Sequence, residues 1–342
     1  MRIAIAILNW NGKHLLEKFL PDVIKHSPSH AEVYVIDNAS TDGSVEFLKS
    51  KFTGVNIICN SINYGFAKGY NEGLKNISAD YFILLNSDVQ VTQNWIEPVI
   101  SLMEADSTIA ACQPKILNYT IRDEFEYAGG GGGFIDKWGY PFCRGRFFDS
   151  FEKDNGQYND VMEIFWASGA CLFIRSKIFF EAGKLDEDFF AHMEEIDLCW
   201  RMKNMGYKVM YCPHSVVYHV GGGTLSKISA TKTFFNFRNN LILLSKNHAP
   251  EYFRIKILLR LKMDALAGLK FLFSGQITHC IAVIRAHWNF FGSLGRTLKK
   301  RKAMKKRIKS YTSSAVYRKS IVVEYFIRRI KKFSDLDKTY FG

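Results

Sequence analysis

Three carboxylates stand within four positions, at Glu194, Glu195 and Asp197, inside the segment FFAHMEEIDLCWR. Aromatic, methionine and leucine side chains surround them, and an apolar setting makes a charged carboxylate costly. Like charges held close together raise at least one pKa, which suits a general base. Acidic residues are also favoured in the first turn of a helix. The pattern therefore allows one carboxylate to begin a helix while another faces a cleft.

A second candidate site combines Asp88 and His219. Asp88 closes the triplet Asn86-Ser87-Asp88 after the apolar run YFILL, and His219 ends the run VVYH shortly before three glycines. A carboxylate at the end of a buried strand suits Mg2+ or Mn2+, which complete their coordination with water and phosphate oxygens. The alternative is that Asp88 caps a helix that begins near residue 93. A lone histidine is usually structural, but it can become a ligand beside a metal-binding carboxylate.

The elements that must position these residues alternate along the first 110 residues. Strands are predicted at 3–8, 32–36, 56–58 and 81–85, and helices at 13–24, 44–51, 67–76 and 95–104. Helices between strands predict a mostly parallel sheet with right-handed crossovers. Ligands bind beyond the carboxyl ends of such strands, so Asp37 and Asp88 are expected at one edge. From its position alone, Asp37 either contacts a nucleobase or ribose, or belongs to the capping cluster of the next helix.

The middle of the chain carries weaker signals. No GxGxxG motif follows the first strand, which argues against a dinucleotide-binding fold. Residues 118–160 mix glycine, aromatic and charged residues, and they predict loops over the sheet. Within them, the glycines at 129–133 predict a mobile loop or a lid over a substrate. Residues 164–174 predict one bent strand.

Positive charge is concentrated at the C-terminal end. The chain has 342 residues and a net charge of +13, and residues 296–342 alone hold 16 Lys and Arg against 3 Asp and Glu. This basic segment predicts contact with an anionic partner. Helices are predicted at 235–246, 251–273 and 276–291. The second of them is basic and amphipathic, so it either lies in a membrane interface or packs on the rest of the protein.

Composition and cysteine usage narrow the class of protein. A hydrophobic content of 47% excludes intrinsic disorder. Seven widely spaced cysteines form no CxxC pair, so neither a disulfide framework nor a structural zinc site is expected. The same pattern predicts a reducing, cytoplasmic location. The apolar start MRIAIAIL lacks a cleavage pattern and predicts a first strand, not a signal peptide. No stretch predicts a membrane-spanning helix.

Seven blocks, taken in order, carry a family resemblance: ILNWNG, VIDNASTDGS, NYGFAKGYNEG, YFILLNSDV, WASGACLFIR, FFAHMEEIDLCWR and YHVGGGT. With them the chain resembles the family 2 inverting glycosyltransferases of the GT-A fold, especially the bacterial rhamnosyltransferase-like branch that builds O-antigen and capsule polysaccharides. The resemblance covers residues 3–245. It implies an α/β fold, with a mostly parallel twisted sheet and helices on both faces, followed by a C-terminal helical extension. The expected domains are a catalytic domain at 1–235, an amphipathic helical extension at 236–295 and a basic tail at 296–342.

The resemblance also implies which residues bind the donor, a UDP- or dTDP-linked sugar. The residues expected to line its pocket are Asn9, Asp37, Asn38, Asn63, Lys68, Asn71, Asn86, Ser87 and Asp88. Asn86 stands where the DxD motif of the family has its first aspartate. Asp88 is therefore the single carboxylate expected to bind Mg2+ or Mn2+, and His219 matches a histidine that completes the metal site in some members.

On the acceptor side, the family places its base in a Glu-Asp pair, which Glu194 and Glu195 occupy here. Because Glu195 stands where aspartate is usual, Glu194 and Asp197 stay open as alternatives. Trp166, Ser168 and Gly169 are expected to shape the acceptor side.

The implied reaction is one in-line displacement that inverts the anomeric configuration, with a hydroxyl of a saccharide, expected to be lipid-linked, as acceptor. The basic C-terminal region would hold the protein peripherally on the anionic inner face of the cell membrane. Two other hypotheses remain. Asn86 and Glu195 depart from the family pattern, which favours a catalytically inactive scaffold. The basic tail favours a nucleic-acid-binding protein, but the neutral remainder and the lack of a nucleic-acid motif argue against a nucleic-acid partner.

Overall fold

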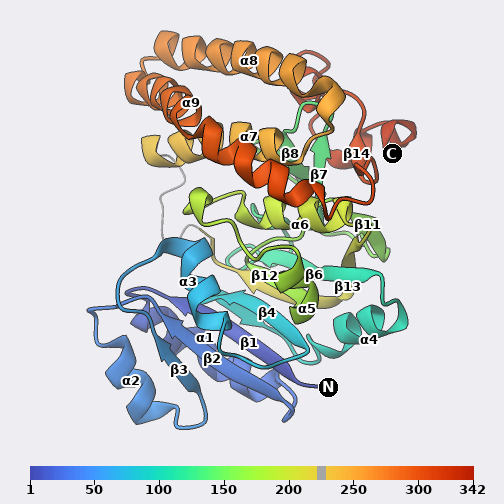
Figure 1. The fold of residues 1–342 in the computed structure, drawn as a ribbon. Helices are drawn as coiled ribbons and strands as arrows, with labels where there is room; N and C mark the ends of the chain where they lie inside the picture. Colours follow the sequence, from blue (N-terminus) through green and yellow to red (C-terminus); the bar gives the residue numbers. More distant parts are fainter. Residues whose placement is uncertain (222–228) are drawn as a thin grey trace.

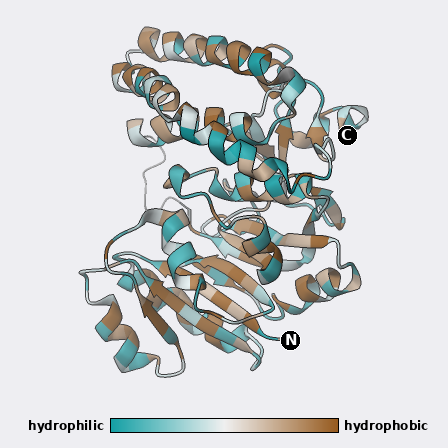
Figure 2. Ribbon diagram, viewed as in Figure 1, coloured by the Kyte–Doolittle hydropathy of each residue, from teal (hydrophilic) through white to brown (hydrophobic). Residues whose placement is uncertain are grey.

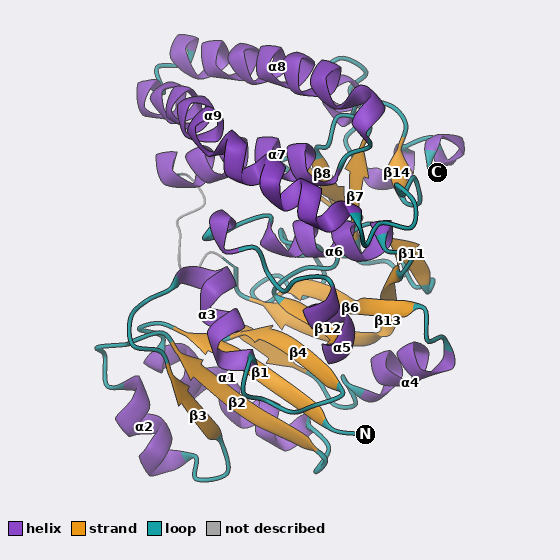
Figure 3. Ribbon diagram, viewed as in Figure 1, coloured by secondary structure: helices purple, strands orange, loops and turns teal. Residues whose placement is uncertain are grey.

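The computed structural model describes residues 1–221 and 229–342. Its centre is a nine-stranded sheet with the order β11-β13-β6-β12-β4-β1-β2-β3, in which β5 also pairs with β13 (Figures 1 and 3). The strands of this sheet are β1 (Ile3–Asn9), β2 (Ala31–Asp37), β3 (Asn56–Cys59), β4 (Tyr81–Asn86), β5 (Val89–Val91), β6 (Ile109–Asn118), β11 (Met162–Ile164), β12 (Cys171–Arg175) and β13 (Lys208–His219). The four strands predicted in the first 110 residues are therefore confirmed.

The sheet is parallel in its N-terminal half and mixed beyond it. Strands β3, β2, β1 and β4 run parallel, as the alternation of strands and helices predicted. Strand β12 enters antiparallel between β4 and β6, while β5 and β11 lie antiparallel to β13. Residues 164–174 thus run from the last residue of β11 through a connecting segment into β12, and do not form the single bent strand that was expected.

Helices cover both faces of the sheet. One face carries α1 (Lys13–His26), α2 (Ser44–Lys51) and α4 (Glu97–Ala105), and the other carries α3 (Gly65–Leu74), α5 (Ser176–Glu181) and α6 (Glu194–Asn204). Side chains alternate across a strand, and the isoleucines of β1 face the first group while Ala4 and Ala6 face the second. The two small alanines belong to the same buried cluster as Tyr70 of α3. This alternation fixes which face each helix covers.

The middle of the chain forms a second, small sheet where loops were expected. Its order is β10-β9-β8-β7-β14, with β7 (Gly133–Asp136), β8 (Pro141–Cys143), β9 (Arg146–Phe147), β10 (Ser150–Phe151) and β14 (Val316–Tyr317). The glycines at 129–133 are buried, so the prediction of a lid or mobile loop is wrong. Their small size is needed for packing, since a Cβ on Gly133 would lie 2.2 Å from the ring of Trp166.

The C-terminal third is helical, as predicted. Its helices are α7 (Ala230–Asn247), α8 (Phe253–Phe273), α9 (Ile277–Lys305) and α10 (Ile321–Phe326), and α7, α8 and α9 form a layer above α6 in Figure 1. The expected domain boundaries at 235 and 295 fall inside α7 and α9, so the division into three domains stays a prediction. Among the described residues, no helix has the length and apolar content needed to cross a membrane.

The basic C-terminal segment is part of the folded protein. Its strand β14 pairs in parallel with β7, and Tyr317, Phe333 and Leu336 are buried against the second sheet. Aromatic rings of that sheet pack on it, with the centroids of Phe134 and Phe333 5.0 Å apart. The apolar residues between the charges therefore anchor this segment, although its composition indicated only a polycation.

Candidate active site

Three strand ends meet at one edge of the sheet, as predicted. Asn9 at the end of β1 stands in register with Asp37 at the end of β2, and Leu8 with Asn86 at the end of β4. The edge therefore brings together the residues that follow these three strands, including Ser87 and Asp88. This is the position where ligands bind in sheets of this kind.

Asp37 and Asn9 form a buried pair at this edge. The Asn9 side-chain amide donates to the Asp37 carboxylate at 2.9 Å, and the other carboxylate oxygen accepts from the Ser40 N–H at 2.9 Å. Asp37 is 2% exposed, so these contacts hold the loop after β2 in place. The Asn9 side-chain oxygen has no hydrogen-bond partner among the described residues. The pair therefore shapes the pocket wall, and direct contact with a nucleotide stays a prediction.

The loop between β3 and α3 is tied to the same edge through Asn38. The Asn38 amide donates to the Asn63 side-chain oxygen at 3.2 Å and to the Gly65 carbonyl at 2.9 Å. Asn63 is exposed, and the Lys68 ammonium lies 4.4 Å from the centre of the Tyr64 ring. Asn63 and Lys68 thus remain available to a ligand at this edge.

Asn71, on the same helix, does not belong to this group. Its side chain is 1% exposed, donates to the Leu185 carbonyl at 2.8 Å and accepts from the Leu185 N–H at 3.2 Å. Because these bonds engage both ends of its carboxamide, Asn71 joins α3 to the segment before α6. The structure therefore corrects the expectation that Asn71 lines the nucleotide pocket.

Asp88 and His219 form the centre of a buried cluster. His219 Nε2 lies 3.1 Å from Asp88 Oδ1 and 3.4 Å from the Asn86 amide nitrogen, and its Nδ1 lies 3.3 Å from Glu126 Oε2. Asp88 does not cap α4, which begins at Glu97. Glu126, only 3% exposed, was not found from the sequence because it lies in the irregular stretch after β6 and reaches the cluster only in the folded chain.

Charge sets the pKa values in this cluster. Burial opposes the charged form of His219, but the carboxylates of Glu126 and Asp88 raise its pKa to about 10. Burial also opposes the charge of Asp88, yet the hydrogen bond and the positive charge of His219 lower the pKa of that carboxyl overall. Asp88 is therefore held as a carboxylate and is paired with a cation.

The chemistry of this cluster fits a divalent cation that is shared with a ligand. Neighbouring ligands of an octahedral Mg2+ or Mn2+ at ~2.1 Å lie about 3 Å apart, which is the separation of Asp88 Oδ1 and His219 Nε2. The imidazole would have to release its proton to bind the metal. Among the described residues, no group of three or more His, Cys, Asp or Glu side chains could hold an ion. Two protein ligands are a usual number where phosphate oxygens and water complete the shell.

Glu194 and Glu195 open helix α6 on the other side of the edge. Both lie in its first turn, and the Oε2 atom of each has no hydrogen-bond partner among the described residues. Burial and the neighbouring charge of Glu195 raise the pKa of Glu194 well above its ordinary value. Burial also raises the pKa of Glu195, and hydrogen bonds from backbone N–H groups at the start of the helix limit the rise to about 7. Near neutral pH, Glu195 is thus the group poised to accept a proton, while burial and the charge of Glu195 favour the protonated form of Glu194.

The loop before these glutamates is strained and clamped. Phe190, His192 and Met193 have φ values of 58°, 68° and 75°, a region that non-glycine residues rarely occupy. The side-chain amide of Asn239, from α7, donates to the carbonyls of Ala191 at 2.8 Å and His192 at 2.7 Å. Such strain persists only where the surroundings hold it, so Asn239 is a positioning residue for the glutamate pair.

Asp197, the third candidate base, has a structural role. It is fully buried, with one carboxylate oxygen bonded to Arg201 and to Lys246 at 2.8 Å each and the other accepting from Asn247 at 2.8 Å. Breaking such a buried charge pair is strongly destabilising. This network joins α6 to α7 and leaves the carboxylate no access to an acceptor, which corrects the expectation that Asp197 could be the base.

Of the three expected acceptor-side residues, only Gly169 borders the glutamates. A Cβ at Gly169 would lie 3.2 Å from the Phe66 ring and 3.9 Å from the Glu195 Cβ, so glycine keeps this approach open. Its neighbour Ala170 accepts a hydrogen bond from the Asn86 N–H at 3.0 Å. Through residues 169–170, the glutamate pair and the Asp88 cluster therefore lie at the same edge of the sheet.

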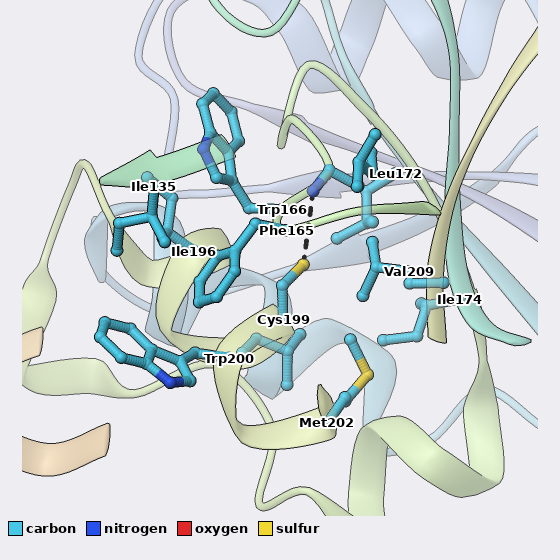
Figure 4. Close-up of a cluster of buried hydrophobic side chains, with 14 of the residues drawn as sticks. Ile135, Phe165, Trp166, Leu172, Ile174, Ile196, Cys199, Trp200, Met202 and Val209 are labelled. Atoms are coloured by element: carbon cyan, nitrogen blue, oxygen red, sulfur yellow. Dashed lines mark hydrogen bonds between the residues drawn. The ribbon is translucent and has the colours of Figure 1, made fainter. Parts of the chain in front are cut away.

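Trp166 and Ser168 point into the protein instead. Trp166 is 7% exposed and donates to the Phe134 carbonyl at 2.8 Å, and Figure 4 shows its ring in a buried cluster with Phe165 and Trp200. The Ser168 hydroxyl accepts from the Ala170 N–H at 3.2 Å, and this residue is 2% exposed. Both support the segment that carries Gly169. The expectation that Trp166 and Ser168 shape the acceptor side is therefore wrong. Of the block YHVGGGT, residues 222–224 lie outside the described residues.

Comparisons with known proteins show which chains and folds this protein resembles. Residues 4–169 match the model of the family described as "Glycosyl transferase family 2". The chain is 22% identical over 263 residues to the N-acetylglucosaminyl-diphospho-decaprenol L-rhamnosyltransferase of Mycobacterium tuberculosis, covering 72% of this chain and 84% of the relative. It is 24% identical over 232 residues to the dTDP-rhamnosyl transferase RfbF of Shigella flexneri, covering 64% and 72%.

A solved structure confirms the fold. The mannosyltransferase PcManGT from Pyrobaculum calidifontis, in complex with GDP-Man and Mn2+, superposes with a TM-score of 0.53 at 13% identity, covering 90% of this chain and 85% of that chain. The expected GT-A fold, a sheet between helices followed by a C-terminal helical region, is therefore confirmed. The family match over residues 4–169, the relatives and the fold together support the expected family 2 glycosyltransferase.

Proposed function

We propose that this glycosyltransferase moves a sugar from a UDP- or dTDP-linked donor to a hydroxyl of a lipid-linked saccharide, with inversion at the anomeric carbon, in the synthesis of a bacterial surface polysaccharide. The observation that carries the proposal is the pair of opposed carboxylate sites at one edge of the sheet. Asp88 is a carboxylate paired with His219, whereas the Glu195 carboxyl, with a pKa raised to about 7, borders Gly169. The two relatives, a rhamnosyltransferase with a decaprenol-linked acceptor and a dTDP-rhamnosyl transferase, support this choice of substrates.

The reaction that follows is a single displacement. The acceptor hydroxyl lies beside Gly169, and Glu195 takes its proton at the carboxylate oxygen that has no hydrogen-bond partner in the described part of the chain. Such proton transfer contributes ~10²–10⁴-fold to a rate. The oxygen attacks the anomeric carbon as the bond to the nucleoside diphosphate breaks, and one displacement inverts that centre. Asp88 and His219 would hold Mg2+ or Mn2+, and the bound ion supplies charge stabilisation to a diphosphate.

The donor assay tests this proposal. The full chain is incubated with a panel of UDP- and dTDP-sugars, with and without Mn2+, and release of nucleoside diphosphate is measured. We expect metal-dependent release with at least one donor, and NMR of the transferred sugar should give the opposite anomer. A folded protein that releases nothing from any donor, with or without metal, contradicts the proposal and favours an inactive scaffold.

The contact with the membrane is a separate part of the proposal, on the cytoplasmic face. Helices α8 and α9 expose many apolar side chains near the turn that joins them, and the brown segments in Figure 2 follow this hairpin. We call the α8–α9 crest the exposed residues Leu266, Leu269, Leu272, Phe273, Ile277, Ile281 and Ile284. Phe273 is 85% exposed, and Lys262 and Lys270 are exposed on the same hairpin. An apolar stripe with cations beside it favours the interface of an anionic membrane.

The crest, and not the basic tail alone, is therefore the proposed contact. Several tail cations already pair within the protein: Lys300 with Asp188 at 2.8 Å and Arg301 with the Ser245 carbonyl at 2.9 Å. The variant Leu269→Ser/Phe273→Ser should reduce flotation with phosphatidylglycerol vesicles by at least about tenfold, since each large apolar side chain contributes roughly 1.5–3 kcal/mol on burial. Ile121→Ser, at a site 47% exposed elsewhere, is the matched control. Equal flotation of both variants and the wild type would contradict this contact.

A further inference from the structure

A hollow of about 540 Å³ opens between the start of helix α7 and the middle of helix α9. It belongs to none of the sites described above. The residues that line it include Phe234, Arg285, Trp288, Asn289, Ser293 and Arg296. Two guanidinium groups and two aromatic rings thus share one open depression.

Its charge is positive. Arg285 is exposed and has no carboxylate partner among the described residues, and its guanidinium lies 5.8 Å from the centre of the Phe234 ring. Arg296 pairs with Asp188 at 3.0 Å, but that carboxylate also binds Lys300 at 2.8 Å. Because Lys300 also pairs with Asp186, Arg296 and Lys300 share two carboxylates, and Arg285 is the guanidinium of the hollow that has no carboxylate partner among the described residues. Guanidinium groups match the oxygens of phosphates in charge and geometry.

The same depression is apolar on its outer side. Trp288 is 76% exposed and Phe291 is 52% exposed. The next exposed apolar residues along α9, Ile284 and Ile281, already belong to the α8–α9 crest. A ligand whose phosphates bind Arg285 can therefore extend a hydrocarbon chain along α9 to the crest. A free sugar phosphate or a nucleotide would leave this apolar face uncovered.

The hollow is also connected to the strained loop that precedes Glu194 and Glu195. Arg296 holds Asp188, which lies in the short turn Glu187–Phe189 immediately before the strained loop. The ring centroids of Phe234 and Phe235 lie 5.4 Å apart, and the Phe235 ring stacks on that of Phe190 with centroids 5.7 Å apart. From Phe190 the chain reaches Glu195 in five residues, about 17 Å or less along the backbone. A group bound in the hollow thus lies within a few sugar units of the proposed base.

From these contacts we infer that the hollow binds the diphosphate of a lipid-linked acceptor. Arg285 and Arg296 hold the phosphates, Trp288 and Phe234 pack on the first isoprene units, and the saccharide extends toward Gly169 and Glu195. This inference rests on the proposed function, because the proposed acceptor is a lipid-linked saccharide. It adds the site and the chemical group by which that acceptor is recognised.

Direct binding tests the site without turnover. The full chain in detergent, without metal or donor, is titrated with farnesyl diphosphate by calorimetry. We expect one site per chain, with binding weakened about tenfold or more in Arg285→Ala, since a charge-assisted hydrogen bond contributes that much, and partly restored in Arg285→Lys. Lys51→Ala removes an exposed cation from α2, at the opposite end of the molecule, and serves as the control.

Two further measurements separate the alternatives. In the transfer assay, Arg285→Ala should raise the KM for a prenyl-diphosphate-linked saccharide about tenfold or more with a much smaller change in kcat. Equal farnesyl diphosphate affinity in wild type and Arg285→Ala would overturn the inference. If Arg285→Ala loses flotation with vesicles but keeps its affinity for farnesyl diphosphate, Arg285 binds membrane headgroups and the inference also fails. If the wild type binds farnesyl diphosphate through Arg285 but releases no nucleotide from any donor, the proposed function fails while the diphosphate site stands.

Discussion

Two carboxylate sites lie near the same segment, residues 169–170, at one edge of this sheet, and their surroundings shift their pKa values in opposite directions. At the Asp88 cluster, a cationic imidazole between two carboxylates lowers the pKa of Asp88 despite its burial. At the start of α6, no cation among the described residues compensates for burial, so the pKa values of both glutamates rise. The difference arises from the partners that each carboxylate meets, because burial opposes charge at both sites.

This contrast assigns the chemistry. A carboxylate that keeps its charge suits a cation, whereas a carboxyl that titrates near neutral pH suits proton transfer. The same logic separates the two glutamates: burial raises both pKa values, but the charge of Glu195 raises that of Glu194 further, whereas several backbone hydrogen bonds limit the pKa of Glu195 to about 7.

The largest effect is expected at Glu195. Glu195→Gln removes the proton acceptor while it keeps the size and polarity of the side chain, and should lower kcat for transfer by ~10²–10⁴-fold. Glu194→Gln is the matched control, because an amide resembles the protonated carboxyl and should lower kcat less than about tenfold. The reverse ranking in steady-state kinetics would make Glu194 the base.

A smaller loss of kcat is expected when the charge of Asp88 is removed. Asp88→Asn keeps the shape of the side chain but removes its charge, and should lower kcat by about 10²–10³-fold because stabilisation of the leaving group is lost. Binding of Mn2+, followed by electron paramagnetic resonance with nucleoside diphosphate present, should weaken in parallel. Asp149→Asn, at an exposed site, is the control. Unchanged Mn2+ binding in Asp88→Asn would remove Asp88 from the metal site.

The smallest effect is expected at the clamp. Asn239→Ala frees the carbonyls of the strained loop and should lower kcat about tenfold and the free energy of unfolding by about 1–3 kcal/mol. A merely structural role would change only stability. Positioning of Glu195 predicts in addition that the midpoint of the pH profile moves below that of the wild type, because water reaches the carboxyl once the loop relaxes. A stability loss with an unchanged pH profile would contradict positioning.

The sequence predicted the fold well where local patterns decide it. The N-terminal strands and helices follow from the alternation of apolar runs with amphipathic ones, and helix 44–51 agrees with α2 at both ends. The second sheet was missed because its strands have two to four residues, too short for any periodicity. Its last strand, β14, also comes from a distant segment, since Val316 of β14 pairs with Ile135 of β7.

For the site, the sequence predicted residues that lie at strand and helix ends but not their partners. Asp88, His219 and the glutamate pair stand at such ends, so their spacing carried the signal. Glu126 and Asn239 reach the site only through long-range contacts, and no local pattern marks them. The family resemblance placed Asn71 in the nucleotide pocket and Trp166 on the acceptor side, and Asp197 was an alternative base, yet buried hydrogen bonds engage all three.

The most direct test of the opposed carboxylates is the pH dependence of kcat/KM for sugar transfer at saturating Mn2+. The base acts only when it is deprotonated, and burial raises the pKa of Glu195 from 4.5 to about 7. The rate should therefore level off about one pH unit above that midpoint, be half-maximal at it, and fall about tenfold per pH unit at more acidic pH. A rate that stays constant down to pH 5 would mean that a carboxylate of ordinary pKa takes the proton, and would contradict the role given to Glu195.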